Sequence, residues 1–208
     1  MRGKKGQPYW NAMLAETGAR QPRFFPALLA DAKFAATARG ELATFRNRPH
    51  ALLHALRLMW ESDAFLALAL YRAQARLGAL GVPVLPRLAH RLAMITAQVC
   101  IGKTVVMQPG VHLGHGQVVI DGFVEIHSGV VIHPWVTIGL RGGSGNYRGP
   151  TIEQDVRIGT GAKILGNVTV HRDARIGANS VVVTDVPAHA TAIGVPARII
   201  PRDGSREQ

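Results

Sequence analysis

The sequence contains a single cysteine, Cys100, among 208 residues, so no disulfide can form within the chain. Such a chain is typical of a reducing compartment, and we expect a cytoplasmic protein. No apolar run reaches the roughly 18 residues that a membrane-spanning helix needs. The N-terminus, MRGKKGQPYWNAMLAETGAR, is basic but lacks the apolar core of a signal peptide. The sequence therefore predicts neither a membrane-spanning helix nor a signal peptide.

Acidic residues are few: 13 Asp and Glu stand against 24 Lys and Arg, which gives a formal net charge of +11. A basic balance favours anionic partners such as nucleic acid, anionic lipid or a phosphorylated cofactor, and it fits a solvated, arginine-rich surface equally well. The basic residues are scattered, with no run longer than RGKK, and no helix-turn-helix, zinc-finger or RNA-binding signature is present. We therefore predict no nucleic-acid partner.

The first half of the chain has a helical pattern. We expect residues 1–22 to be flexible and residues 23–98 to form a helical domain. Ser62 or Asp63 is a suitable N-cap, and Pro86 suits the first turn of the last helix. The predicted helices are FPALLADAKFAATARGEL (25–42), PHALLHALRLMW (49–60), SDAFLALALYRAQARLGAL (62–80) and PRLAHRLAMITAQ (86–98).

From residue 99 an apolar residue recurs every six positions, which fits neither the period of an α-helix nor that of an alternating strand. A six-residue unit is a short flat strand and a turn, three units close a triangular coil of about 18 residues, and such coils stack as a parallel β-helix. We predict this fold up to residue 200, with a flexible tail over 201–208. The thirteen lead positions are Ile101, Met107, Leu113, Ile120, Ile126, Ile132, Ile138, Ile152, Ile158, Ile164, Val170, Ile176 and Val182.

Two irregularities interrupt the repeat. One extra residue separates Leu113 from Ile120, and the loop LRGGSGNYRGP, residues 140–150, has no lead residue. The loop has four glycines, and long loops in compact folds are often functional. An unspecific surface insertion is the alternative.

The stretch RIGTGAKILGNVTVHRDARIGANSVVVTDVPAHATAIGVPARII, residues 157–200, closely resembles the C-terminal half of bacterial serine O-acetyltransferases, which are hexapeptide-repeat acyltransferases. The likeness covers residues 99–200 and extends weakly into FLALALYRA, residues 65–73. It implies a mainly β fold with N-terminal α structure: a left-handed parallel β-helix preceded by a helical domain. It also implies acetyl-CoA as donor, a small hydroxyl acceptor, a homotrimer that can pair into a hexamer, and active sites between adjacent subunits.

The segment PGVHLGHGQVVI, residues 109–120, matches the part of this family that carries the catalytic base, and the match assigns that role to His115. An imidazole titrates near neutral pH and can take the proton of an acceptor hydroxyl. The extra residue that follows fits a bulge that would turn the ring outward into a cleft. The alternative is an exposed histidine on a turn without a catalytic role.

The group that would orient this imidazole departs from the family pattern. Members often carry an acidic residue fifteen positions before the base, and Cys100 occupies that position here. A thiol orients an imidazole poorly unless its pKa lies far below roughly 8.5, and a small buried apolar residue is the other reading of Cys100. Asp121 or Glu125 could substitute from a neighbouring turn.

Two further departures concern the acceptor. The serine enzymes often have Asp directly before the catalytic histidine, where this chain has Gly114. They also carry a histidine in an Arg-His-Pro stretch, where this chain has Arg148-Gly149-Pro150. A pocket that loses hydrogen-bonding groups loses discrimination for its acceptor. A serine-like acceptor and a sugar or other hydroxyl acceptor are both candidates.

The resemblance places donor contacts at Leu140 after VTIG, at Thr160 in IGTGAK and at Ala178 in IGANS. Lys163 in GAK and Arg198 in GVPAR are candidates for the phosphates of CoA, where a cation meets a fixed anion. Solvated surface charges, and the small residues that tight turns require, are the alternatives.

The loop over residues 140–150 matches the family loop that closes over donor and acceptor. Arg141 and Arg148 are candidates there for phosphates or an acidic acceptor. Trp135, in HPWVTIG, would wall the thioester region or pack at a trimer interface.

Two other functions fit parts of the sequence. His112, His115, His127 and His133 cluster in the early coils, and some left-handed β-helix proteins are zinc-dependent carbonic anhydrases. These histidines lack the spacing of those enzymes, so no metal is expected. The other alternative is a non-catalytic scaffold or CoA-binding protein, which a thiol at the acidic position would suit.

Overall fold

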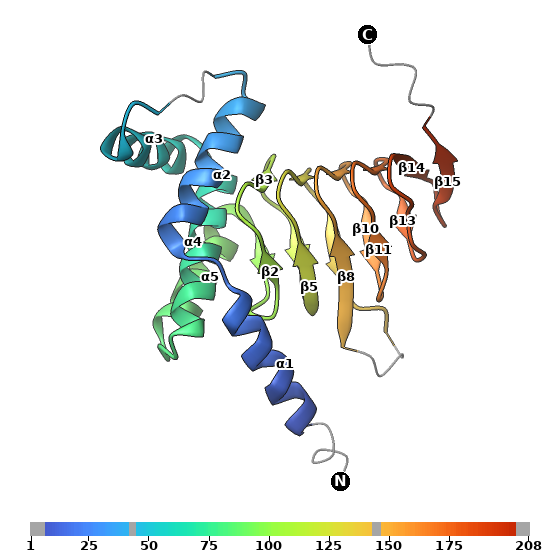
Figure 1. Ribbon diagram of the computed structural model, residues 1–208, viewed down its shortest axis with the longest axis horizontal. Coiled ribbons are helices and arrows are strands. Elements are labelled where there is room, and N and C mark those ends of the chain that lie inside the picture. Colours follow the sequence, from blue (N-terminus) through green and yellow to red (C-terminus); the bar gives the residue numbers. More distant parts are fainter. Residues whose placement is uncertain (1–6, 42–44, 143–146, 203–208) are drawn as a thin grey trace.

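The computed structural model describes residues 7–41, 45–142 and 147–202. Helices stand at one end of an elongated stack of short strands, and the chain ends at the opposite end of that stack (Figure 1). None of the described helices has the length and apolarity needed to cross a bilayer. The helices are α1 (Gln7–Arg20), α2 (Phe24–Ala38), α3 (Arg48–Glu61), α4 (Asp63–Ala79) and α5 (Leu85–Ala97).

The helix starts follow the predicted signals. The Ser62 side chain accepts a hydrogen bond from the Phe65 amide, which confirms the predicted N-cap of α4. Pro86 lies in the first turn of α5, where its missing N–H breaks no helical hydrogen bond. The four helices predicted between residues 25 and 98 are therefore present, with ends shifted by a few residues.

Helix α1 corrects the expectation that residues 1–22 are flexible, because Gln7–Arg20 is helical. The ring of Trp10 packs edge-on against Phe123 of the strand region, with centroids 5.0 Å apart. The helix lacks a continuous apolar stripe, so its stability depends on contacts that no local pattern reveals. Residues 1–6 lie outside the described residues.

The described part of residues 100–201 forms short strands in three sheets. Sheet A contains β1 (Cys100–Ile101), β4 (Val119–Ile120), β7 (Thr137–Gly139), β10 (Lys163–Leu165) and β13 (Val181–Val182). Sheet B contains β2 (Val106–Met107), β5 (Phe123–Ile126), β8 (Arg148–Ile152) and β11 (Thr169–Val170). Sheet C contains β3 (His112–Leu113), β6 (Val131–Ile132), β9 (Arg157–Ile158), β12 (Arg175–Ile176), β14 (Ala190–Ile193) and β15 (Arg198–Pro201).

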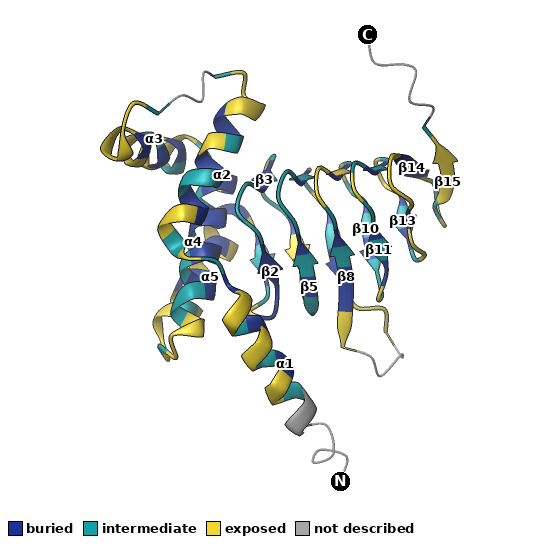
Figure 2. Ribbon diagram, viewed as in Figure 1, coloured by how far each residue is buried: buried dark blue, intermediate teal, exposed yellow. Residues whose placement is uncertain are grey.

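Successive strands enter successive sheets, so three strands make one coil, and β1, β2 and β3 make the first coil. Neighbouring coils pair in parallel, with Ile101 opposite Ile120 and Ile120 opposite Ile138. All thirteen lead residues are at most 3% exposed, which confirms the predicted six-residue period. Figure 2 shows buried and more exposed residues alternating along the strands. Each lead side chain therefore stacks on its counterpart, and the shared apolar core drives the coiling.

The predicted loop and tail are shorter than expected. Strand β8 begins at Arg148, so the end of the loop over residues 140–150 is already part of sheet B. Strand β15 includes the first residue of the tail 201–208 and pairs antiparallel with β14, because this pairing covers the last edge of sheet C. Residues 143–146 and 203–208 lie outside the described residues.

The first coil has an open edge that faces the helices. Its alternate amides donate to the second coil at 2.8 to 3.0 Å, whereas other backbone groups point away from that coil. Gln74 Nε2 donates to the Ile101 carbonyl oxygen at 3.1 Å, and the Tyr71 hydroxyl donates to the Val105 carbonyl oxygen at 2.9 Å. Burial raises the pKa of Tyr71 to about 12, so this hydroxyl keeps its proton. Helix side chains thus replace the missing preceding coil.

A buried ion pair contacts residues 107–111 of the same open edge of the first coil. Asp31 of α2 and Arg72 of α4 are 0% and 3% exposed, and Arg72 Nε donates to Asp31 Oδ2 at 2.9 Å. Asp31 Oδ1 accepts hydrogen bonds from the amides of Gly110 and Val111 at 2.8 and 3.1 Å. Arg72 also donates to the carbonyls of residues 107–108. Both charges are therefore compensated, and they join two helices to the first coil.

Arg72→Met should lower the free energy of unfolding by about 3–5 kcal/mol, because Asp31 would stay buried without its counter-ion. Urea denaturation of the full chain measures this loss. The matched control is Arg57→Met, which removes the exposed partner of Glu61 and should lower the free energy of unfolding far less, because water screens this pair. Equal losses of unfolding free energy in the two variants would show that the buried Asp31–Arg72 pair stabilises the fold no more than an exposed pair does.

Candidate active site

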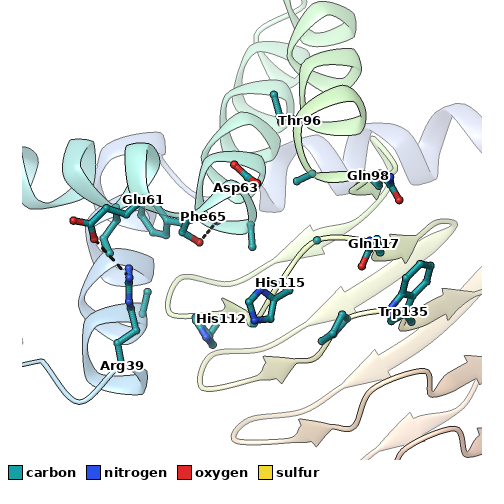
Figure 3. Close-up of a pocket in the computed structure, with 18 of the residues that line it drawn as sticks. Arg39, Glu61, Asp63, Phe65, Thr96, Gln98, His112, His115, Gln117 and Trp135 are labelled. Atoms are coloured by element: carbon teal, nitrogen blue, oxygen red, sulfur yellow. Dashed lines mark hydrogen bonds and ion pairs between the residues drawn. The ribbon is translucent and has the colours of Figure 1, made fainter.

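A cavity of about 690 Å³ lies where the helices meet the first two coils. Its walls come from α2 to α5 on one side and from the turns after β3 and β6 on the other. Figure 3 shows how these side chains converge. The labelled residues are Arg39, Glu61, Asp63, Phe65, Thr96, Gln98, His112, His115, Gln117 and Trp135.

His115 lies on the turn after β3, and its imidazole is exposed at the cavity. The end of α5 holds this turn, because the Gln117 amide donates to the Ala97 carbonyl oxygen at 2.9 Å. Gly116 approaches the same carbonyl so closely that a Cβ there would lie 2.0 Å from the oxygen. Gln117 has a φ of 62°, and this left-handed residue accommodates the extra position in the repeat. The backbone that presents His115 is therefore locked against α5.

His112, the first residue of strand β3, is a second imidazole in the cavity wall. Its ring is half-buried, and Phe34 of α2 packs edge-on against it with centroids 6.3 Å apart. Burial lowers the pKa of His112, and the neighbouring His133, Arg39 and His115 lower it further. The ring is therefore neutral near pH 7, with one N–H donor and one acceptor nitrogen.

The helical domain adds charged side chains that no motif in the sequence identified. Arg39 Nη2 lies 3.6 Å from Glu61 Oε2, and Arg39 Nε lies 3.7 Å from Glu41 Oε1. Asp63, in the first turn of α4, is exposed at the cavity. All of these residues precede His115 by more than 50 positions, so only the packing of helices on the coil brings them to it.

Glu125, one candidate to orient the imidazole, is directed elsewhere. It lies on β5 in sheet B, pairs with Arg20 of α1, and its Oε1 lies 3.2 Å from His127 Nε2. Glu125 and Arg20 line a separate cavity beside α1. Within one chain, Glu125 does not face His115.

Cys100 and Asp121 lie near each other on the sheet A side of the coil. Asp121 covers Gly102, where a Cβ would meet Asp121 Oδ1 at 2.3 Å. Burial raises the pKa of the Cys100 thiol, and the Asp121 charge raises it further. The thiol is therefore protonated at neutral pH and supplies no negative charge for an imidazole.

Two predicted donor residues align with His115 on one edge of the stack. Sheet C pairs the lead residues of β3, β6, β9 and β12 in register. His115, Thr160 and Ala178 each lie two positions after such a lead residue, and all three are exposed. The Asn179 amide donates to the Thr160 carbonyl oxygen at 2.8 Å, which ties successive turns together. These residues form a column along the edge between sheets C and A.

The other predicted donor residues lie apart from this column. Leu140 and Arg141 follow β7 at the edge between sheets A and B, and Arg148 begins β8 near the same edge. Arg198 begins the exposed strand β15 at the far end of the stack. One chain alone does not bring these residues to His115.

Lys163, a candidate for the CoA phosphates, contacts the backbone of the cavity wall. Its Nζ donates to the Trp135 carbonyl oxygen at 2.7 Å. Trp135 lines the cavity and has a φ of 65°, a backbone conformation that favours glycine. The Lys163 ammonium therefore supports the strained turn that forms part of the cavity wall.

The four clustered histidines separate in space. His112 and His115 line the cavity, and His133 lies behind Gly114, whose Cβ would be 3.6 Å from His133 Nδ1. His127 lies on the sheet B side. Across the described ranges, no group of three or more His, Cys, Asp or Glu side chains is placed to hold a metal ion.

Comparison with known proteins identifies the family. Residues 149–184 match the family model described as bacterial transferase hexapeptide (six repeats). A serine acetyltransferase of Synechocystis sp. is 38% identical over 169 residues, which cover 79% of this chain and 68% of that relative. The chain belongs to the serine acetyltransferase family. It is therefore an acetyl-CoA-dependent O-acetyltransferase, as the resemblance of residues 157–200 predicted.

Solved structures of this family match the fold. The crystal structure of serine acetyltransferase from Vibrio cholerae aligns with a TM-score of 0.73 at 31% identity, covering 93% of this chain and 72% of that chain. A serine acetyltransferase in complex with CoA aligns with a TM-score of 0.67 at 29% identity, covering 84% of this chain and 70% of that chain. The chain spans about two thirds of the length of the curated relatives it matches, 66 to 68% for three of them.

Gly116→Ala should reduce kcat/KM by about 10²-fold, because the new methyl group forces the turn that carries His115 away from α5. Steady-state release of CoA from acetyl-CoA measures the change. Gly78→Ala is the matched control, since a Cβ at Gly78 meets no atom within 4 Å. Wild-type activity in Gly116→Ala would show that the contact with Ala97 does not position the turn.

The Cys100 thiol should react slowly with iodoacetamide at pH 8, because its raised pKa leaves little thiolate. A pH titration of the alkylation rate should give a midpoint higher than that of an exposed thiol, because burial and the Asp121 charge both raise the pKa. The same chain in urea serves as the reference for an unperturbed thiol. A midpoint below that of the chain in urea would instead indicate a thiolate able to orient an imidazole.

Proposed function

We propose that this chain transfers the acetyl group of acetyl-CoA to a hydroxyl of a small acceptor, with His115 as general base. The observation that carries the proposal is the exposed His115 imidazole, held on a rigid turn at the mouth of a 690 Å³ cavity. A cavity of this size suits a small acceptor together with the end of a donor.

In the proposed reaction His115 takes the proton of the acceptor hydroxyl while the acceptor oxygen attacks the thioester carbonyl carbon. The carbon–sulfur bond then breaks, and the proton passes from His115 to the CoA sulfur. An acetyl ester and free CoA are the products. General-base catalysis of this kind contributes about 10²–10⁴-fold. Because Cys100 stays protonated, we propose that the locked turn, rather than an anionic partner, orients the ring.

We further propose that the coil winds left-handed and that three copies assemble around the sites. Thr160 and Ala178 lie on the edge that carries His115, whereas Leu140, Arg141 and Arg148 lie at another edge. A complete donor site therefore needs the second edge from a neighbouring copy. Arg198 at the far end of the stack is the candidate for the distal phosphates, and Lys163 acts through Trp135.

Serine is the first candidate acceptor, because the relatives that match most of this chain are named for it. A sugar or another neutral hydroxyl compound is the second candidate. Gly114 and Gly149 favour it, because neither residue offers a side chain to an amino-acid acceptor.

His115→Ala should reduce acetyl transfer by at least about 10²-fold and leave CoA binding unchanged, because the variant removes only the base. Thiol release from acetyl-CoA measures turnover, and calorimetric titration with CoA measures donor binding. Assembly is checked by light scattering, so that a folding defect is recognised. Unchanged turnover in this variant would remove His115 from the mechanism. Wild-type protein that binds CoA but releases no thiol with any acceptor would favour the scaffold function.

A further inference from the structure

Helix α1 leaves the other helices and runs beside the strands of sheet B, where it reaches the end of the loop over residues 140–150 (Figure 1). The proposed reaction does not use this contact. We infer that Trp10 of α1 is a positioning residue for the donor, acting through Tyr147 at the end of the loop. The inference rests on the proposed function, which assigns both loop ends to the donor site of a neighbouring copy.

The two described ends of the loop lie on one short segment, residues 122–124. At the first end Leu140 packs against Gly122, where a Cβ would meet Leu140 Cγ at 2.9 Å. At the second end the Phe123 amide donates to the Tyr147 carbonyl oxygen at 3.4 Å. An element that holds this segment in place therefore holds both loop ends.

The indole of Trp10 contacts the segment and the loop at the same time. Its ring centroid lies 5.0 Å from that of Phe123 and 5.4 Å from that of Tyr147, with interplanar angles of 74° and 77°. Both contacts have the edge-on geometry that aromatic pairs favour. Trp10 therefore links a strand residue of the second coil to the last residue before β8.

Contacts at the other end of α1 hold the helix in place. Gln21, the residue after the helix, donates from Nε2 to the Val105 carbonyl oxygen at 2.8 Å. Arg20 pairs with Glu125 of β5. The helix lies so close to sheet B that the cavity between them is only about 80 Å³. Helix α1 is therefore a fixed support for Trp10.

This support reaches residues that the proposed donor site uses. Arg148 directly follows Tyr147, and it lines the small cavity beside α1. Leu140, at the other loop end, depends on the same segment, residues 122–124. A shift of the loop ends would misplace both donor contacts relative to a neighbouring copy. Trp10 itself touches neither substrate in this arrangement, so its effect is one of position.

The test measures the Kd of CoA by calorimetric titration of the full chain. Trp10→Ala should raise this Kd about 3- to 10-fold, because the loop end loses an edge-on ring contact. The kcat at saturating acetyl-CoA should change less than about twofold, since Trp10 does not act in the chemical step. Trp10→Phe, which keeps a ring, should recover most of the loss. Trp60→Ala is the matched control, because Trp60 is 91% exposed on α3.

A double-mutant cycle tests whether Trp10 acts through Tyr147. Tyr147→Ala should raise the Kd of CoA by a similar factor. The double variant should show no further increase, because the second change removes a contact that is already lost. Tyr147→Ala also replaces the first variant if Trp10→Ala does not fold. Light scattering and urea denaturation measure assembly and stability in each variant.

The outcomes separate the inference from the proposed function. An unchanged Kd in both single variants, or additive increases in the double variant, overturns the role of Trp10 while the proposed function stands. A Kd that rises only together with loss of assembly shows that Trp10 supports the fold alone, which also overturns the inference. Wild-type protein that binds no CoA overturns the proposed donor site and the inference with it.

Discussion

The first coil of the strand stack has no preceding coil, and its unpaired backbone groups are the constraint on which the rest of the structure depends. A carbonyl buried without a donor destabilises a fold by about 1–3 kcal/mol. Side chains from the helical part of the chain satisfy this edge, among them Tyr71, Gln74, Arg72 and Asp31. The helices are therefore a polar cap on a repetitive structure, as well as an apolar layer against its end.

The same capping contacts create the cavity. Asp31 ties α2 to the amides just before β3, and this contact brings Phe34 to His112 and Arg39 to the cavity wall. At the other side, α5 ends on the turn that carries His115. The contacts that support the fold and those that hold the His115 turn thus lie on one segment, residues 110–117.

The arrangement of the residues proposed to bind the donor has a different physical origin. In a three-sided stack, residues spaced by one coil fall on one edge, so Thr160 and Ala178 align with His115. Leu140 and the following loop fall on the next edge because they come after sheet A rather than sheet C. A single three-sided stack cannot bring two of its own edges together, so the proposed donor site, which uses both edges, would need a second copy. This requirement follows from the shape of the coil.

The period of the lead residues determined by itself that residues 100–201 form stacked short strands, because an inward side chain every six positions is compatible with little else. The motif that predicted a role for His115 is a short continuous stretch of sequence, so it too could be recognised without the tertiary structure. Helix α1, the cap formed by Asp31 and Arg72, and the wall of Arg39, Glu61 and Asp63 were decided only by the tertiary structure. Each depends on pairing between residues far apart in the chain, and a one-dimensional pattern does not encode which distant partners meet.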